Sequence, residues 1–176
     1  AGHKTHLHLL AVKRCLNAKI VVIMKPSLPL KLFDLCVIPQ HDDVKSVSNV
    51  FITNTTLVNF NLNTKKKEDM ALFLIGGPSK HFYWNSKILL EQIKNISKKF
   101  KFKKLLITTS RRTPIDFIDE FNRLKIRNIK LYEYTKTAND WLDKNIIRAK
   151  NIWVTNDSYS MLIEAIASGA YTDILE

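Results

Sequence analysis

Short aliphatic segments that alternate with amphipathic segments constrain the fold of this chain most strongly. The aliphatic segments predict strands at 70–75, 105–109, 129–132 and 152–155. The amphipathic segments predict helices at 85–100, 113–124, 139–150 and 158–167. Such alternation with short turns is typical of a parallel sheet covered by helices on both faces. The sequence therefore predicts the α/β class.

The first third of the chain predicts a smaller, looser unit of the same kind. A helix is predicted at 6–17 and short strands at 35–38 and 50–53. The run Ile20–Met24 is apolar throughout, which predicts a parallel strand buried on both faces. Polar residues dominate from 59 to 69 and indicate a linker. We therefore expect two Rossmann-like domains, at 1–66 and 67–176, the first of them incomplete.

Composition excludes some classes of function. The chain has 176 residues and a net charge of +12, but only six of its 28 basic residues are arginine, the residue that reads guanine edges, so nucleic-acid binding is disfavoured. No apolar run approaches the roughly 18 residues of a membrane span. Two cysteines without a C-x-x-C pair are typical of a cytoplasmic protein with buried free thiols.

No motif implies a cofactor or metal. The histidines at positions 3, 6 and 8 have no acidic or cysteine neighbours, so we expect no metal site. The chain also lacks the spacing of a P-loop or of a dinucleotide-binding loop. We therefore expect no cofactor.

Three polar loops follow predicted strands, at the edge where ligands bind in parallel sheets. They are Gly76–His81, Ser110–Pro114 and Asn156–Ser160. Consecutive glycines allow close backbone approach to a ligand, and Arg111 and Arg112 next to a predicted helix start favour an anion site. A phosphate or diphosphate ligand is the functional interpretation, and ordinary turn and capping residues are the alternative.

Six segments together resemble one known family over nearly the whole chain. They are Ala1–His6, Met24–Pro29, Phe33–Cys36, Gly76–His81 with Trp84, Thr108–Pro114 and Val154–Met161. In order and content they resemble the mitochondrial-fission "elongated mitochondria" family, whose bacterial members are often labelled predicted nucleoside-diphosphate-sugar epimerases. The fold of that family is similar to that of the two-domain GT-B glycosyltransferases.

The resemblance implies a nucleotide-sugar ligand and, if the chain is an active enzyme, transfer of its glycosyl group. The segment Glu164–Gly169 is similar to the helix that holds the nucleotide-sugar in GT-B proteins, although Ala170 replaces the usual Lys-Pro continuation. On this view Glu164 faces the same cleft as Gly77 and reaches a ribose hydroxyl, and His3 is the acceptor-side base. The remaining expected substrate-binding residues are Gly2, His6, Gly76, Gly77, Ser79, Lys80, Ser110, Arg111, Arg112, Asp157, Ser158 and Ser160.

A non-catalytic interaction protein with the same fold is the alternative. Because family members look longer at both ends, we expect a fragment whose first sheet leaves an apolar edge and part of one face uncovered. This predicts a homo-oligomer or a complementing chain as partner. Contact with a membrane surface stays open at this point.

Overall fold

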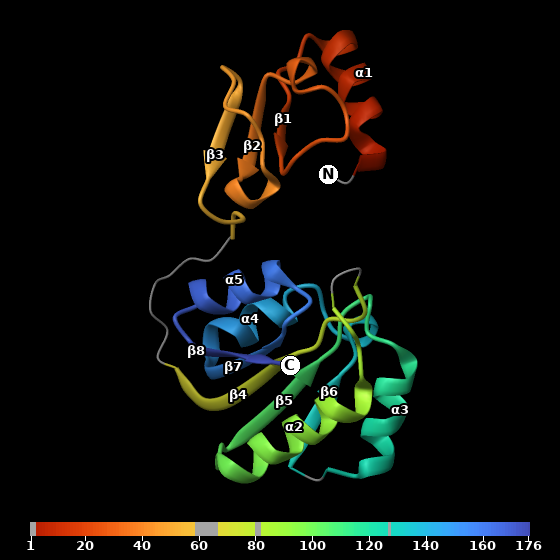
Figure 1. The fold of residues 1–176 in the computed structure, drawn as a ribbon, viewed down its shortest axis with the longest axis vertical. Helices are drawn as coiled ribbons and strands as arrows, with labels where there is room; N and C mark the ends of the chain where they lie inside the picture. The colour runs from red at the N-terminus through yellow and green to blue at the C-terminus, as the bar shows by residue number, and fades with distance from the viewer. Residues whose placement is uncertain (1–2, 59–66, 80–81, 127) are drawn as a thin grey trace. The chain divides into compact units, whose positions relative to one another are not determined.

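The computed structural model describes residues 3–58, 67–79, 82–126 and 128–176. It divides into two compact units, Ala1–Leu57 and Val58–Glu176 (Figure 1). Each unit contains one parallel sheet, so the α/β class and the two Rossmann-like sheets are confirmed. The expected linker at 59–66 lies outside the described residues.

The second unit is built on a five-stranded parallel sheet with the strand order β6-β5-β4-β7-β8. Its strands are β4 (Glu68–Leu74), β5 (Lys104–Thr108), β6 (Ile129–Tyr132), β7 (Ala149–Thr155) and β8 (Tyr171–Leu175). Its helices are α2 (Ser86–Lys99), α3 (Ile115–Leu124), α4 (Trp141–Arg148) and α5 (Tyr159–Ala167), with a short 3₁₀ turn, η4 (Tyr134–Lys136). The chain order of the strands reverses between β4 and β7.

Helices cover both faces of this sheet (Figure 1). Alternate residues of the central segment point to opposite faces, so Ala71, Phe73 and Ile75 pack beneath α2 and α3, against Leu90 and Phe117 among others. Met70, Leu72 and Leu74 pack on the other side, beneath α4 and α5. This two-sided burial explains why residues 70–75 are continuously apolar.

Most elements of the second unit match the sequence predictions, and the differences are local. The strand Ile129–Tyr132 agrees with its prediction at both ends. The predicted helix at 139–150 is shorter, because Ala149 and Lys150 already belong to β7. The edge strand β8 was not predicted. Its outer residues, such as Tyr171, are exposed, so its sequence has none of the continuous apolar character of β4.

The first unit is a three-stranded parallel sheet in the order β1-β2-β3. Its strands are β1 (Val21–Ile23), β2 (Leu35–Pro39) and β3 (Val50–Thr53). The helix α1 (His6–Leu16) packs on one face, and three short 3₁₀ turns, η1 (His3–Thr5), η2 (Leu30–Leu32) and η3 (Gln40–Asp42), complete the unit. Asp34 fixes the start of β1 by accepting hydrogen bonds from Ile20 N at 2.8 Å and Lys13 Nζ at 2.9 Å.

The other face of the first sheet is apolar and open. Val22 is 4% exposed, whereas its neighbours Val21 and Ile23 are 55% and 54% exposed. Register places Ile23, Val37 and Phe51 side by side on that open face. The two-sided burial that an apolar run usually indicates is absent for β1, because α1 covers one side and no described residue covers the other, and this agrees with the expectation that part of one face of the first sheet is uncovered.

Two further sequence predictions can be compared with the structure. Cys36 is buried, and burial raises the pKa of its thiol, whereas Cys15 is exposed on α1, so only one of the two free thiols is buried as expected. Among the described residues, no helix is long and apolar enough to cross a membrane.

Candidate functional site

The polar loops of the second unit meet at the carboxyl ends of β4, β5 and β7. The strand order reverses between β4 and β7, and in open α/β sheets ligands bind in the crevice outside such a reversal. The loops after β4 and β7 are connected there, because Gly76 N donates to Thr155 Oγ1 at 2.8 Å and Gly77 N donates to Asp157 Oδ2 at 3.1 Å. This edge is the candidate site.

The loop after β5 is tied to the loop after β4 by hydroxyl groups. Ser110 Oγ donates to the carbonyl oxygen of Gly76 at 2.9 Å, and Thr113 Oγ1 lies 2.6 Å from the same oxygen. The helix predicted at 113–124 starts later than expected, because its N-cap is Pro114 and α3 begins at Ile115. The Thr113 hydroxyl is engaged with the neighbouring loop instead.

Both glycines allow the loops to pack against one another. A Cβ on Gly76 would lie 2.2 Å from Asp157 Oδ2, and a Cβ on Gly77 would lie 2.0 Å from the backbone oxygen of Arg112. From the sequence, this pair was expected to allow close approach of a ligand. The structure gives a different reason for glycine at both positions, namely contact between the loops that form the candidate site.

The two arginines have different environments. Arg112 Nη2 lies 2.6 Å from Asp157 Oδ2, in an ion pair whose carboxylate is 3% exposed. Arg111 is exposed and makes no ion pair or hydrogen bond with the part of the chain that the structure describes. Arg111 is therefore exposed, whereas Arg112 is already paired with a carboxylate, and the anion-binding role expected of the two arginines stays a prediction.

The helix that follows β7 begins at this edge. Its N-cap is Ser158, the first residue of the helix predicted at 158–167, but the Ser158 side chain makes no capping hydrogen bond, and Ser160 is exposed in the first turn. Glu164 is half-buried on the same helix. Burial raises the pKa of its carboxyl group, and the negative charge of Asp143 on α4 acts in the same direction. Glu164 is not among the described residues that line a pocket with Gly77, so its expected role stays a prediction.

We expect the substitution Glu164→Gln to stabilise the protein at neutral pH. The folded state binds the Glu164 proton more tightly than the unfolded state, whose carboxyl has its ordinary pKa of 4.5. Stability is therefore lost as the pH rises from that value through the folded pKa, and glutamine removes this loss. Melting temperatures of the two proteins should differ at pH 7 and converge at pH 3.5. A wild type that melts higher at pH 7 would contradict the prediction.

The remaining expected site residues are distributed as follows. His6 is buried in the first unit, with Nδ1 3.4 Å from Ser27 Oγ and its ring edge-on to Phe33. His3 lies in η1 of the same unit. Ser79 forms an isolated bridge with Phe82 in the second unit. Gly2 and Lys80 lie outside the described residues. The structure thus brings together Gly76, Gly77, Ser110, Arg112 and Asp157.

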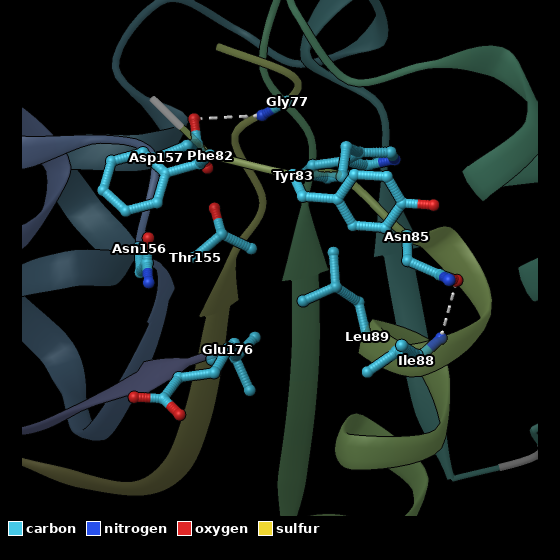
Figure 2. A pocket seen from close by; sticks show the side chains of 12 residues that line it. Gly77, Phe82, Tyr83, Asn85, Ile88, Leu89, Thr155, Asn156, Asp157 and Glu176 are labelled. Atoms are coloured by element: carbon cyan, nitrogen blue, oxygen red, sulfur yellow. Dashed lines mark hydrogen bonds between the residues drawn. The ribbon is translucent and has the colours of Figure 1, made fainter. Parts of the chain in front are cut away.

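An aromatic pocket that was not predicted from the sequence lies beside this cluster. Phe82, Tyr83 and Trp84 line it together with residues from the start of α2 and the ends of β7 and β8. Figure 2 shows this pocket with the Gly77–Asp157 hydrogen bond at its edge. Three consecutive aromatic residues directly after a glycine loop are the signal that could have revealed it. Among the described residues, no group of three or more histidine, cysteine or acidic side chains could hold a metal ion.

Comparison with known families agrees with this architecture. The sequence profile described as "Mitochondrial fission ELM1" matches residues 1–176. The chain belongs to the mitochondrial fission ELM1 family. The match covers both sheets and all three loops of the candidate site, so the family resemblance inferred from those loops is confirmed. A search of curated proteins finds no match to this ELM1-family chain.

Proposed function

We propose that this ELM1-family chain binds a nucleotide-sugar, or another ligand that contains a diphosphate, at the carboxyl ends of β4 and β7. In this proposal residues 1–66 and 67–176 are parts of the two Rossmann-like domains of a GT-B-type fold, and the second holds the ligand. The observation that supports it best is the reversal of strand order between β4 and β7, with two polar loops joined across it.

The positively charged groups at the carboxyl ends of the strands favour a diphosphate ligand. Arg111 supplies an exposed guanidinium that no described carboxylate neutralises, and guanidinium groups bind phosphate oxygens with two parallel hydrogen bonds. The N-terminus of α5, where the Ser158 side chain makes no capping bond, adds the positive end of a helix dipole. Glu164, half-buried on α5, would contact a ribose hydroxyl of the ligand. Glycosyl transfer is the activity proposed for such a ligand.

Ligand-dependent melting tests the proposal. A nucleotide-sugar at 100 times its dissociation constant should stabilise the chain by about 2.7 kcal/mol. The substitution Arg111→Ala should weaken binding at least tenfold, since a hydrogen bond to a charged group contributes about 1.5–3 kcal/mol. The matched control is Arg123→Ala, which removes an exposed arginine from α3 that pairs with Glu120. Equal binding by both variants would refute the role of Arg111.

A non-catalytic interaction protein is the second candidate, and the open apolar face of the first sheet favours it. Val21, Ile23 and Phe51 expose more than half of their area there, which is typical of a protein–protein contact. A panel of nucleotides and nucleotide-sugars that produces no shift in melting temperature would favour this candidate over the first.

A further inference from the structure

The connection between α2 and β5 carries the densest run of positive charge in the chain. Its sequence is Lys-Lys-Phe-Lys-Phe-Lys-Lys, and it occupies residues 98–104, called the basic segment below (Figure 1). No acidic residue occurs between Glu91 and Asp116, so no neighbour in sequence offsets these lysines. The basic segment lies at the amino end of β5, whereas the candidate site lies at the carboxyl ends of the strands.

The aromatic residues of the basic segment anchor it to the protein. The ring centroids of Phe100 and Phe102 lie 5.7 Å and 6.1 Å from that of Trp153, a buried residue of β7. Because both phenylalanines pack on Trp153, the lysines that alternate with them, Lys101 and Lys103, remain exposed. The fold therefore presents these lysines outward on a packed support.

Most of the positive charge in the basic segment has no carboxylate partner. Lys104 pairs with Glu68 Oε2 at 3.2 Å. The other four lysines are exposed and make no ion pair with the part of the chain that the structure describes: Lys98, Lys99, Lys101 and Lys103. Lys98 and Lys99 complement the negative end of the α2 dipole, but Lys101 and Lys103 lie beyond the helix. An external anionic partner would supply the missing charge.

The side chains of the basic segment favour an anionic lipid surface over a nucleic acid. All its cations are lysines, which attract phosphate groups as point charges and lack the planar fork with which arginine reads base edges. Phe100 exposes 37% of its surface among them, and phenylalanine beside lysine suits the boundary between lipid headgroups and acyl chains. Each lysine near an anionic membrane increases affinity about fivefold, so four unpaired lysines are enough for reversible binding.

We propose that the basic segment docks the second unit on an anionic lipid bilayer, with Lys98, Lys99, Lys101 and Lys103 at the level of the lipid phosphates. The inference goes beyond the proposed function, because it uses no residue of the candidate site. Docking through the amino end of β5 leaves the opposite edge of the sheet, which carries the candidate site, open to water.

Flotation of the full chain with vesicles tests the docking, since aggregated protein does not float. Vesicles of phosphatidylcholine with roughly one-third phosphatidylglycerol should carry the chain upward, and vesicles of phosphatidylcholine alone should not. Raising the NaCl concentration from about 0.1 M to about 0.5 M should release the chain, because salt screens the exposed lysines. Equal flotation with both kinds of vesicle, flotation with neither, or binding that survives the high salt would overturn the proposal.

Two sets of substitutions distinguish the basic segment from the net charge of the whole chain. The first changes the four unpaired lysines of the basic segment to glutamine and should weaken vesicle binding at least tenfold. The matched control changes four exposed lysines elsewhere to glutamine: Lys4, Lys31, Lys45 and Lys150. Both sets lower the net charge from +12 to +8.

The control variant should bind vesicles at least fivefold more tightly than the variant of the basic segment. Tryptophan fluorescence checks that the second unit is folded in both. If the fourfold variant fails to fold, Lys101→Gln/Lys103→Gln replaces it, because these two residues lie outside any helix or strand. Equal binding by the control and the folded variant of the basic segment would overturn the proposal.

Two further measurements exclude other partners and other surfaces. Duplex DNA, added at the same phosphate concentration as the vesicle surface, should leave the chain on the vesicles. Release of the chain by this DNA would assign the basic segment to nucleic acid and overturn the proposal. Arg111→Ala should float as the wild type does, because Arg111 lies beyond the opposite end of β5. Loss of flotation in this variant would place the docking surface at the candidate site instead, whereas normal flotation with lost nucleotide-sugar binding would support both proposals independently.

Discussion

Replacing Gly77 with alanine is expected to destabilise the second unit by roughly 3 kcal/mol, the upper part of the range for overpacking. The new Cβ would lie 2.0 Å from the backbone oxygen of Arg112, and a backbone atom cannot rotate away as a side chain can. All three tryptophans, at 84, 141 and 153, belong to the second unit, so their fluorescence during urea unfolding reports on this unit.

Two other glycines provide matched controls. Gly169→Ala should cost about 1 kcal/mol, since Gly169 has φ +73° but no atom lies within 4 Å of its Cβ position. Gly76→Ala places the new methyl against the Asp157 carboxylate, a side chain. Removing that carboxylate in Gly76→Ala/Asp157→Ala should therefore restore part of the lost stability, whereas Asp157→Ala should not rescue Gly77→Ala. Equal costs for all three glycines would show that the loops can separate without penalty.

The second large effect is expected at the open face of the first sheet. We predict that the purified chain self-associates through this face and that the triple variant Val21→Thr/Ile23→Thr/Phe51→Thr shifts it to a monomer. These side chains are 55%, 54% and 61% exposed, and no charged side chain separates them across the paired strands. Two copies of one uncharged apolar surface can pack together symmetrically. Light scattering over a range of concentrations measures the shift.

Substitutions of two neighbouring valines distinguish an effect on self-association from an effect on folding. Val21→Thr should leave stability nearly unchanged, whereas Val22→Thr places a hydroxyl in the core of the first unit and should cost about 1–3 kcal/mol. The first unit contains no tryptophan, so its fluorescence cannot report on unfolding. Hydrogen exchange of its backbone amides measures the difference in stability between the two variants instead. A wild-type chain that stays monomeric at high concentration, with strong protection across Val21–Ile23, would contradict the prediction.

The sequence predicted the parallel strands of the second unit because the central residues of these strands are buried on both faces, and uninterrupted apolar runs such as Met70–Ile75 indicate such burial. It failed where burial is one-sided. Tyr171–Leu175 is an edge strand with exposed positions, and Val21 and Ile23 are apolar yet uncovered. In both cases the neighbours in space, rather than the residues themselves, decide the outcome.

The candidate site, like the fold, could be predicted from the sequence only in part. Its location followed from loops at the carboxyl ends of parallel strands, and Gly76, Gly77, Ser110 and Asp157 do meet there. The pairing of Arg112 with Asp157 joins loops 45 residues apart, and no local pattern specifies it. Thr113 shows the same limit, because it was predicted to begin a helix at 113–124, whereas in the structure it precedes α3 and its hydroxyl contacts the carbonyl oxygens of Ile75 and Gly76.

The central position of β4 has a consequence for biosynthesis. One neighbour, β5, follows it within about 35 residues, but the other, β7, is separated from it by some 80 residues of chain. At a synthesis rate of roughly 5–20 residues per second, β4 waits on the order of 4 to 16 s on the ribosome before its second edge can be paired. During that interval one edge and much of one face of a strand whose last five residues are buried in the folded protein are available to chaperones or to other nascent chains. The yield of folded protein should therefore depend on how quickly residues 75–155 are translated.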